Sequence, residues 1–322
     1  MKDSFSRTID YMRISVTNRC NMRCNYCMPV AFKNFSSNEI LSYDEILELI
    51  KAAVRCGITK YKITGGEPLV RPKIVEFVSK IKNISGVEQV TMTTNGVLLE
   101  NFVEALKNAG LDAVNISLDS LNPKRFEKIT GFDLLNKVMD GISAALSHNI
   151  PTKINTVLQF GINDDEWDNF IQITKENPVD VRFIELMPLG EGKNFQGITN
   201  TQILSNIKEK YQNIYEDKST HGNGPAVYLK IPGFAGSIGF ISAICDKFCA
   251  RCNRLRLTAD GKLKPCLSFA DSIDVKKFLR NTNQQKNLEE IIKEAIEMKP
   301  LEHNFENPDK ISETRKMFEI GG

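Results

Sequence analysis

Residues 20–27 read Cys20-Asn21-Met22-Arg23-Cys24-Asn25-Tyr26-Cys27, so three thiols lie within one short stretch. Thiols this close in sequence share a loop and can surround one metal centre. A cubane iron–sulfur cluster normally takes four thiolates, and no fourth cysteine is near. One iron would then be open to a small molecule. The spacing alone also allows a zinc site completed by a distant residue.

The sequence around this loop alternates β-branched runs with helical patterns. We expect strands at 12–16, Lys60–Thr64, 89–93, 113–118, 152–157 and 181–186. Amphipathic helices are expected between them at 43–56, 73–81, 98–109, 134–147 and 165–175, with Ser42 and Asp165 as N-caps. Repeated strand–helix units favour parallel strands, but six are too few for a closed eight-fold barrel. We therefore predict an α/β fold, a partial (β/α)6 TIM-like barrel, with a flat doubly wound sheet as the alternative.

The pattern changes after residue 199. Residues 226–231, 237–241 and 255–258 resemble short antiparallel strands, 216–224 resembles a loop, and 288–298 resembles a last helix. We divide the chain into a barrel at 1–224 with the first cysteine group and a C-terminal region at 225–322. That region holds a second group, Cys249, Cys252 and Cys266. Because Cys245 repeats the first spacing, a four-cysteine zinc ribbon is the alternative there.

Composition limits the classes of partner and location. The net charge is +2 and charged residues make up 25%, so no global excess of charge points to nucleic acid or an acidic membrane. A local cluster of bases must hold any anionic ligand. Eight cysteines in two clusters fit metal binding in a reducing compartment better than disulfides, and we see neither a signal peptide nor a membrane span. We expect a cytoplasmic protein with no nucleic-acid or membrane partner, and leave a homodimer open.

Two motifs together resemble those of the radical S-adenosylmethionine (SAM) superfamily. They are the cysteine triplet with Tyr26 before its last cysteine, and Thr64-Gly65-Gly66-Glu67-Pro68 after the second expected strand. The resemblance implies a 4Fe-4S cluster on Cys20, Cys24 and Cys27 whose open iron binds SAM. One electron from an external donor would then cleave SAM to methionine and a 5′-deoxyadenosyl radical. SAM contacts would come from Tyr26, Gly66, Glu67, Ser117 and Met187.

A longer match is more specific. Residues 248–256, Phe-Cys-Ala-Arg-Cys-Asn-Arg-Leu-Arg, with Thr258-Ala259-Asp260-Gly261 and the terminal Gly321-Gly322, resemble the GTP 3′,8-cyclase family of molybdenum cofactor biosynthesis. The resemblance implies a second 4Fe-4S cluster on Cys249, Cys252 and Cys266, with guanine at its open iron and Cys245 incidental. It implies that Gly321 and Gly322 enter the active site and assist conversion of GTP. GTP contacts would be Arg13, Lys60, Lys62, Thr93, Lys153, Arg182, Arg254, Leu255 and Arg256, with Lys62 standing where the family carries arginine.

The implied reaction begins when the radical takes hydrogen from C3′ of GTP. The carbon radical adds to C8 of guanine, and an electron and a proton complete 3′,8-cyclo-7,8-dihydroguanosine triphosphate. Two other functions stay open. One is a radical SAM enzyme that modifies a peptide or another small molecule. The other is a zinc or iron–sulfur interaction module without catalysis.

Overall fold

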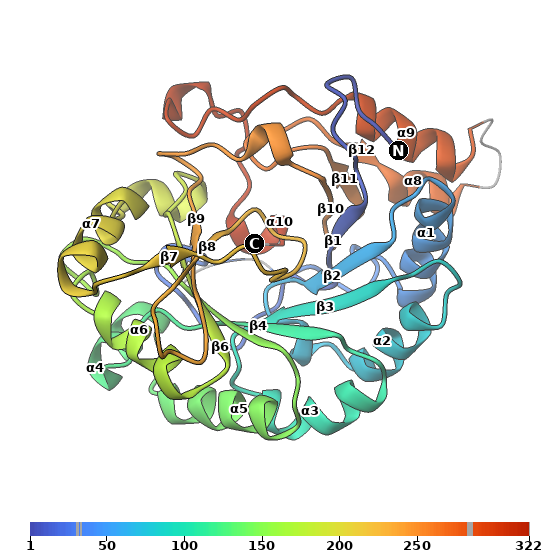
Figure 1. The fold of residues 1–322 in the computed structure, drawn as a ribbon. Helices are drawn as coiled ribbons and strands as arrows, with labels where there is room; N and C mark the ends of the chain where they lie inside the picture. Colours follow the sequence, from blue (N-terminus) through green and yellow to red (C-terminus); the bar gives the residue numbers. More distant parts are fainter. Residues whose placement is uncertain (30–31, 33, 282–285, 322) are drawn as a thin grey trace.

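In the part of the chain that the structure describes, the strands form one twelve-stranded sheet (Figure 1). The computed structural model describes residues 1–29, 32, 34–281 and 286–321. The sheet order is β12-β11-β10-β1-β2-β3-β4-β5-β6-β9-β8-β7. The strands are β1 (Tyr11–Ser15), β2 (Lys60–Thr64), β3 (Gln89–Thr94), β4 (Ala113–Ser117), β5 (Thr152–Thr156), β6 (Val179–Ile184), β7 (Tyr215–Glu216), β8 (Val227–Lys230), β9 (Ile238–Ile241), β10 (Arg254–Leu257), β11 (Lys262–Lys264) and β12 (Ile273–Asp274).

The expected partial barrel is confirmed. Strands β1 to β6 pair in parallel in chain order, and helices cover the outside of the curved sheet (Figure 1). Strands β7 and β12 are the two ends of the sheet, so it does not close. The six expected strands match the observed ones to within one or two residues at each end.

Amphipathic periodicity and capping explain the helices. Helix α1 (Tyr43–Arg55) buries Ile46, Leu49 and Ile50 against the sheet. Ser42 Oγ accepts a hydrogen bond from the backbone N–H of Glu45, and the Glu45 carboxylate accepts one from the backbone N–H of Ser42. Such a cap stabilises a helix by about 1 kcal/mol. The other α-helices are α2 (Ile74–Lys82), α3 (Leu99–Asn108), α4 (Pro123–Thr130), α5 (Leu135–Ser147), α6 (Trp167–Glu176), α7 (Asn200–Lys210), α8 (Val275–Arg280), α9 (Leu288–Glu297) and α10 (Met317–Ile320).

One expected helix start was wrong, and the sequence did not predict α4, α7, α8 or α10. Helix α6 begins after Glu166, and Asp165 instead pairs with Arg125 of α4. Helix α4 itself was not expected, although Asn122 caps it and Pro123 occupies its first position. Its signal is short and weakly apolar, so the periodicity did not reveal it. None of the helices in the described part of the chain has the length and apolar character that a membrane span requires.

The C-terminal strands extend the barrel sheet at both sides, which the sequence did not predict. We expected short antiparallel strands, but β9 pairs in parallel with β6 and β10 pairs in parallel with β1. Only their outer partners, β8 and β11, run antiparallel. Strand β7 also pairs with β8 across the expected boundary at 224, so the two-domain division remains a prediction.

Candidate functional site

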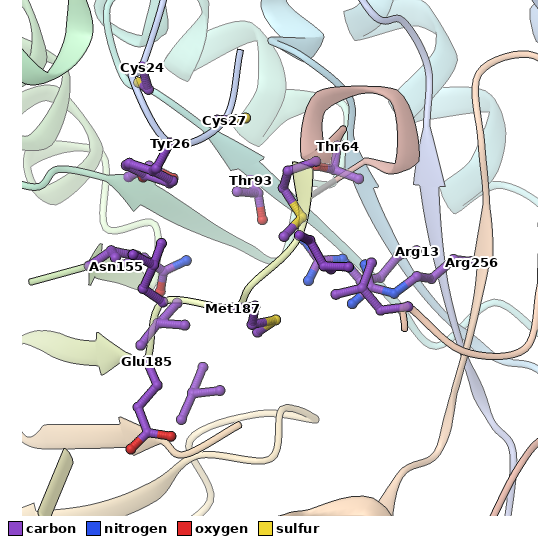
Figure 2. Close-up of a pocket in the computed structure, with 18 of the residues that line it drawn as sticks. Arg13, Cys24, Tyr26, Cys27, Thr64, Thr93, Asn155, Glu185, Met187 and Arg256 are labelled. Atoms are coloured by element: carbon purple, nitrogen blue, oxygen red, sulfur yellow. The ribbon is translucent and has the colours of Figure 1, made fainter. Parts of the chain in front are cut away.

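Both cysteine groups line one cavity of about 290 Å³, which we call the cysteine cavity. It lies at the carboxyl ends of the central parallel strands, where ligands bind in barrels and open α/β sheets. Figure 2 shows Arg13 and Arg256 together on one side of it, and Tyr26 and Asn155 on the other. The expected site residues in its lining are Cys20, Cys24, Tyr26, Cys27, Gly66, Thr93, Ser117, Met187, Cys249, Cys252, Cys266, Arg13, Arg254 and Arg256.

The first cysteine group follows β1 on a loop. Cys20 accepts hydrogen bonds from the backbone N–H of Met22 at 3.4 Å and from Asn95 Nδ2 at 3.8 Å. Burial raises the pKa of Cys20 to about 11 and that of Cys27 to about 12. These thiols are buried and neutral, and they accept few hydrogen bonds. They are suited to bind a metal centre, because metal binding deprotonates them.

The positions of the metal-ligating side chains also test the alternative of a zinc site. Within the ranges that the structure describes, no three His, Cys, Asp or Glu side chains lie close enough to hold a single metal ion. Three ligands of one zinc would all lie about 2.3 Å from the same ion. Thiols arranged around a shared cavity fit a cluster of several irons, each bound by one cysteine.

Gly65 and Gly66 are required because the backbone at Thr17 and Arg19 lies very close to them. A Cβ on Gly66 would lie 2.4 Å from the carbonyl oxygen of Arg19, and one on Gly65 would lie 2.6 Å from that of Thr17. The glycines therefore let the end of β2 pack against the loop of the first cysteines. This role comes in addition to the expected contact of Gly66 with SAM.

Glu67 lies beneath the cavity and is absent from its lining. It is 1% exposed, and its carboxylate accepts hydrogen bonds from the backbone N–H groups of Leu69 and Asn95 and from the hydroxyl of Thr94. Burial raises its pKa to about 7. The structure thus gives this carboxylate a role in fixing two strand ends, and its contact with SAM stays a prediction of the sequence.

Two residues that the sequence did not assign also line the cavity. Asp119 follows β4 and accepts a hydrogen bond from the Tyr26 hydroxyl at 2.7 Å. Burial raises the pKa of Asp119 to about 6. His303 is 4% exposed, and its Nε2 atom has no hydrogen-bond partner among the described residues. A lone histidine carries no spacing signal, so only its position in the fold reveals it.

The second cysteine group lines the same cavity. Cys249 accepts a hydrogen bond from the backbone N–H of His303 at 3.4 Å, and Cys252 accepts one from Lys299 Nζ at 3.7 Å. Burial alone would raise the pKa of Cys252, but Arg254 and Lys299 outweigh it and lower that pKa to about 7. Cys245 is exposed and absent from the lining, which agrees with an incidental thiol.

The expected GTP contacts lie in rows across neighbouring strands. Arg13 of β1 is paired with Arg256 of β10 on one side and with Lys62 of β2 on the other. Burial lowers the pKa of Lys62 well below its ordinary value, and Arg182 and Arg13 lower it further. Cations at paired positions on adjacent strands repel one another, because like charges directly opposite in a sheet are destabilising. The row is therefore suited to a multiply charged anion.

A second cavity of about 340 Å³, the basic cavity, is lined by Lys62, Lys153 and Arg182. Arg182 Nε donates to Asn155 Oδ1 at 2.8 Å, and Asn155 itself lines the cysteine cavity, so this contact joins the two cavities. Lys153 Nζ contacts Asp180, the Tyr228 hydroxyl and the carbonyl of His221. The predicted GTP contacts thus lie partly in the cysteine cavity and partly in the adjoining basic cavity, which suits an elongated nucleotide.

Two predicted GTP contacts lie in neither lining. Lys60 forms an ion pair with Asp10 at 2.7 Å. Leu255 is fully buried in the core, so its side chain packs away from both cavities. Only the backbone of Leu255 remains available for the predicted role.

The C-terminal tail lies inside the ring of strands, with α10 at its centre (Figure 1). Arg315 anchors it through two hydrogen bonds of 3.1 Å to Asp260 of the Thr258-Ala259-Asp260-Gly261 turn. The backbone N–H of Phe318 hydrogen-bonds Cys27. Gly321 has φ of +83°, and a Cβ there would lie 2.7 Å from that of Ser15. Gly322 lies outside the described residues.

Comparison with known proteins assigns the chain. Residues 14–173 match the model for the radical SAM superfamily, and residues 179–305 match the model described as Molybdenum Cofactor Synthesis C. A GTP 3′,8-cyclase of Clostridium perfringens (strain 13 / Type A) is 46% identical over 323 residues, covering 100% of both chains. One of Alkaliphilus oremlandii (strain OhILAs) is 45% identical over 327 residues, again covering 100% of both chains. The chain belongs to the GTP 3′,8-cyclase family.

Solved structures support the fold of this GTP 3′,8-cyclase family member. Streptococcus suis SuiB bound to S-adenosylmethionine aligns with a TM-score of 0.61, covering 91% of this chain and 67% of that one, at 15% identity. At that identity the likeness concerns the fold alone. The family assignment itself rests on the sequence matches, which run through both cysteine groups.

Proposed function

We propose that this chain is a radical SAM GTP 3′,8-cyclase that converts GTP to 3′,8-cyclo-7,8-dihydroguanosine triphosphate, the first step of molybdenum cofactor biosynthesis. The observation that carries the proposal is the cysteine cavity, because two cysteine triplets and the Arg13–Arg256 pair line one space. Family membership supports the same reaction, since the relatives of C. perfringens and A. oremlandii are named GTP 3′,8-cyclases.

As a radical SAM protein, the chain takes a 4Fe-4S cluster and SAM. Cys20, Cys24 and Cys27 would hold this cluster, which when bound supplies the electron for reductive cleavage of SAM. Tyr26, Gly66, Ser117 and Met187 would orient SAM, since all four line the cavity beside these cysteines. The hydrogen bond from Tyr26 to Asp119 fixes the tyrosine ring in that position.

The second 4Fe-4S cluster is part of the proposal. Cys249, Cys252 and Cys266 would hold it at the opposite wall of the cysteine cavity, where the guanine base would bind. Arg254 and Arg256 stand two residues apart on β10 and line the cavity beside these cysteines. Their planar guanidinium groups can donate paired hydrogen bonds to acceptor atoms of the nucleotide.

The triphosphate would extend toward the basic cavity. Lys62, Lys153 and Arg182 line that space, and the row of Arg256, Arg13 and Lys62 across neighbouring strands leads to it. A polyanion bound there would offset the mutual repulsion of these cations. Thr93 lines the cysteine cavity and would contact the nucleotide between its two ends.

The Gly-Gly tail would complete the site by excluding water and contacting the nucleotide. Arg256 already holds the carbonyl of Gly321, so the tail reaches the residues that we assign to GTP. The electron comes from an external one-electron donor in this proposal. A cytoplasmic location stays a prediction of the sequence, and a homodimer stays open.

The direct test is anaerobic reconstitution of the full chain with iron and sulfide, followed by addition of SAM, dithionite and GTP. We expect 5′-deoxyadenosine and a cyclised nucleotide in the product mixture. Formation of 5′-deoxyadenosine without any nucleotide product or GTP binding would favour a radical SAM enzyme with another substrate. A colourless preparation that holds zinc and no iron would refute radical SAM chemistry altogether.

A further inference from the structure

A buried lysine with no role in the proposed reaction lies beside the C-terminal cysteines. Lys299 follows helix α9 and is 4% exposed. Its Nζ atom donates to Cys252 Sγ at 3.7 Å, to the carbonyl oxygen of Arg254 at 2.9 Å and to that of Pro265 at 2.9 Å. An ammonium group has three N–H donors. All three are directed at the segments that carry the second cysteine group.

These contacts tie together two separate parts of the chain. Arg254 begins β10 just after Cys252, and Pro265 directly precedes Cys266. The ammonium therefore links the two segments that carry Cys252 and Cys266. A second cation braces the same region, because Arg7 donates to the carbonyls of Cys249 at 3.0 Å and Pro300 at 2.7 Å. Arg7 thus holds the residue that follows Lys299 close to the segment of Cys249.

The first cysteine group has a different set of hydrogen-bond donors. Cys20 accepts from the neutral amide of Asn95 and from a backbone N–H, while Cys252 accepts from a charged ammonium. Reduction adds negative charge to an iron–sulfur cluster. Hydrogen bonds to the sulfurs and nearby positive charge stabilise the reduced state, and both shift the reduction potential upward.

We propose that Lys299 is a positioning residue of the C-terminal cluster, which raises the reduction potential of that cluster and fixes the spacing of its cysteines. The inference rests on the second cluster that the proposed function includes. In this role Lys299 acts through Cys252 and touches neither SAM nor GTP. Its charge makes the cluster at the guanine-binding wall easier to reduce.

The test measures the reduction potential of the C-terminal cluster by itself. The full chain carrying Cys20→Ala, Cys24→Ala and Cys27→Ala retains only the second cysteine group, so iron content and the electron paramagnetic resonance signal report that cluster alone. Into this parent we would introduce Lys299→Met, Lys299→Arg and the control Lys247→Met. Lys247 also neighbours this region, but its ammonium pairs with Glu302 and Glu306 at the surface.

At the midpoint potential of the parent, we expect Lys299→Met to lower the ratio of reduced to oxidised cluster about tenfold. This corresponds to a midpoint potential that is lower by about 59 mV for a one-electron couple. Lys299→Arg and Lys247→Met should stay near the parent. Loss of iron from Lys299→Met with retention in Lys299→Arg would also support a requirement for the charge.

Equal midpoints in Lys299→Met and Lys247→Met would overturn the inference. Loss of iron from both Lys299 variants would overturn the role of the charge in the reduction potential, because the shape of lysine rather than its charge would then be needed. A parent that binds no iron would instead refute the second cluster, and with it that part of the proposed function.

Discussion

Arg256 Nη1 donates a hydrogen bond to the carbonyl oxygen of Gly321 at 3.3 Å, which brings the end of the chain to the wall of the cysteine cavity. A side chain at Gly321 has no space there, because its Cβ would lie 2.7 Å from that of Ser15. We therefore predict that Gly321→Ala, like deletion of Gly321 and Gly322, abolishes the cyclic product. Both clusters and SAM cleavage should persist, as measured by iron content and 5′-deoxyadenosine formation.

The chain offers a matched control for this substitution. Gly233 has the same φ of +83° as Gly321, but nothing lies within 4 Å of its Cβ position. Gly233→Ala should show the backbone strain of about 1–2 kcal/mol for a left-handed residue without any loss of cyclisation. Full product formation by Gly321→Ala or by the truncated chain would remove the tail from the active site.

The first cysteine group is tested by Cys24→Ala. Cys24 lines the cavity between Cys20 and Cys27, and three thiolates are the minimum for the SAM-binding cluster. We expect loss of 5′-deoxyadenosine formation and of about half the iron, with the C-terminal cluster retained. Normal SAM cleavage by this variant would contradict the assignment of the loop.

The second cysteine group is tested by comparing two cysteines. Cys266→Ala should lose the C-terminal cluster and GTP turnover but keep the first cluster. Cys245→Ser should keep the full iron content, because Cys245 is exposed and lies outside the cavity lining. If Cys245→Ser loses one cluster's iron, the C-terminal site uses four cysteines and has no open iron for guanine.

Two lysines of β2 give a matched pair for GTP binding. Lys62 lines the basic cavity, whereas Lys60 pairs with Asp10 and lines neither cavity. Lys62→Ala should weaken GTP binding by about 1.5–3 kcal/mol, as expected for a hydrogen bond to a charged group, without changing SAM affinity. Lys60→Ala should change GTP affinity much less. Equal losses of GTP affinity in Lys62→Ala and Lys60→Ala, measured as equilibrium binding, would show that a position in the basic cavity does not decide which lysine binds GTP.

The charge of Lys62 predicts a pH dependence. Burial and the neighbouring arginines lower its pKa in the free protein, and a bound triphosphate would raise it again. GTP affinity should therefore be full below the free pKa and fall as the pH rises through it, and binding between the two pKa values should take up a proton. Calorimetry of GTP binding in buffers of different ionisation enthalpy measures this uptake. An equal uptake by Lys62→Met would assign the proton to another group.

Local signals in the sequence predicted the barrel and its cysteine sites. Lys60–Thr64 was predicted to the residue, because a short β-branched run between helical patterns admits one interpretation. The pairing of β9 and β10 with the barrel was missed, since strand direction depends on partners far away in sequence. His303 and Lys299 were missed for a related reason: a single histidine or lysine becomes functional only through what the fold puts next to it.

The sequence by itself determined the chemistry of this protein, because cysteine spacing, the glycine pair and the Gly-Gly end are local patterns that require no knowledge of distant contacts. The tertiary structure decided which residues share a space. In the fold, Cys24, Cys252 and Arg256 line one cavity, and Arg256 donates a hydrogen bond to Gly321. Lys60 and Glu67 lie outside the lining of that cavity and pair with other residues. Those juxtapositions depend on strand order and on side-chain packing across the barrel, and neither is encoded by any one segment of the chain.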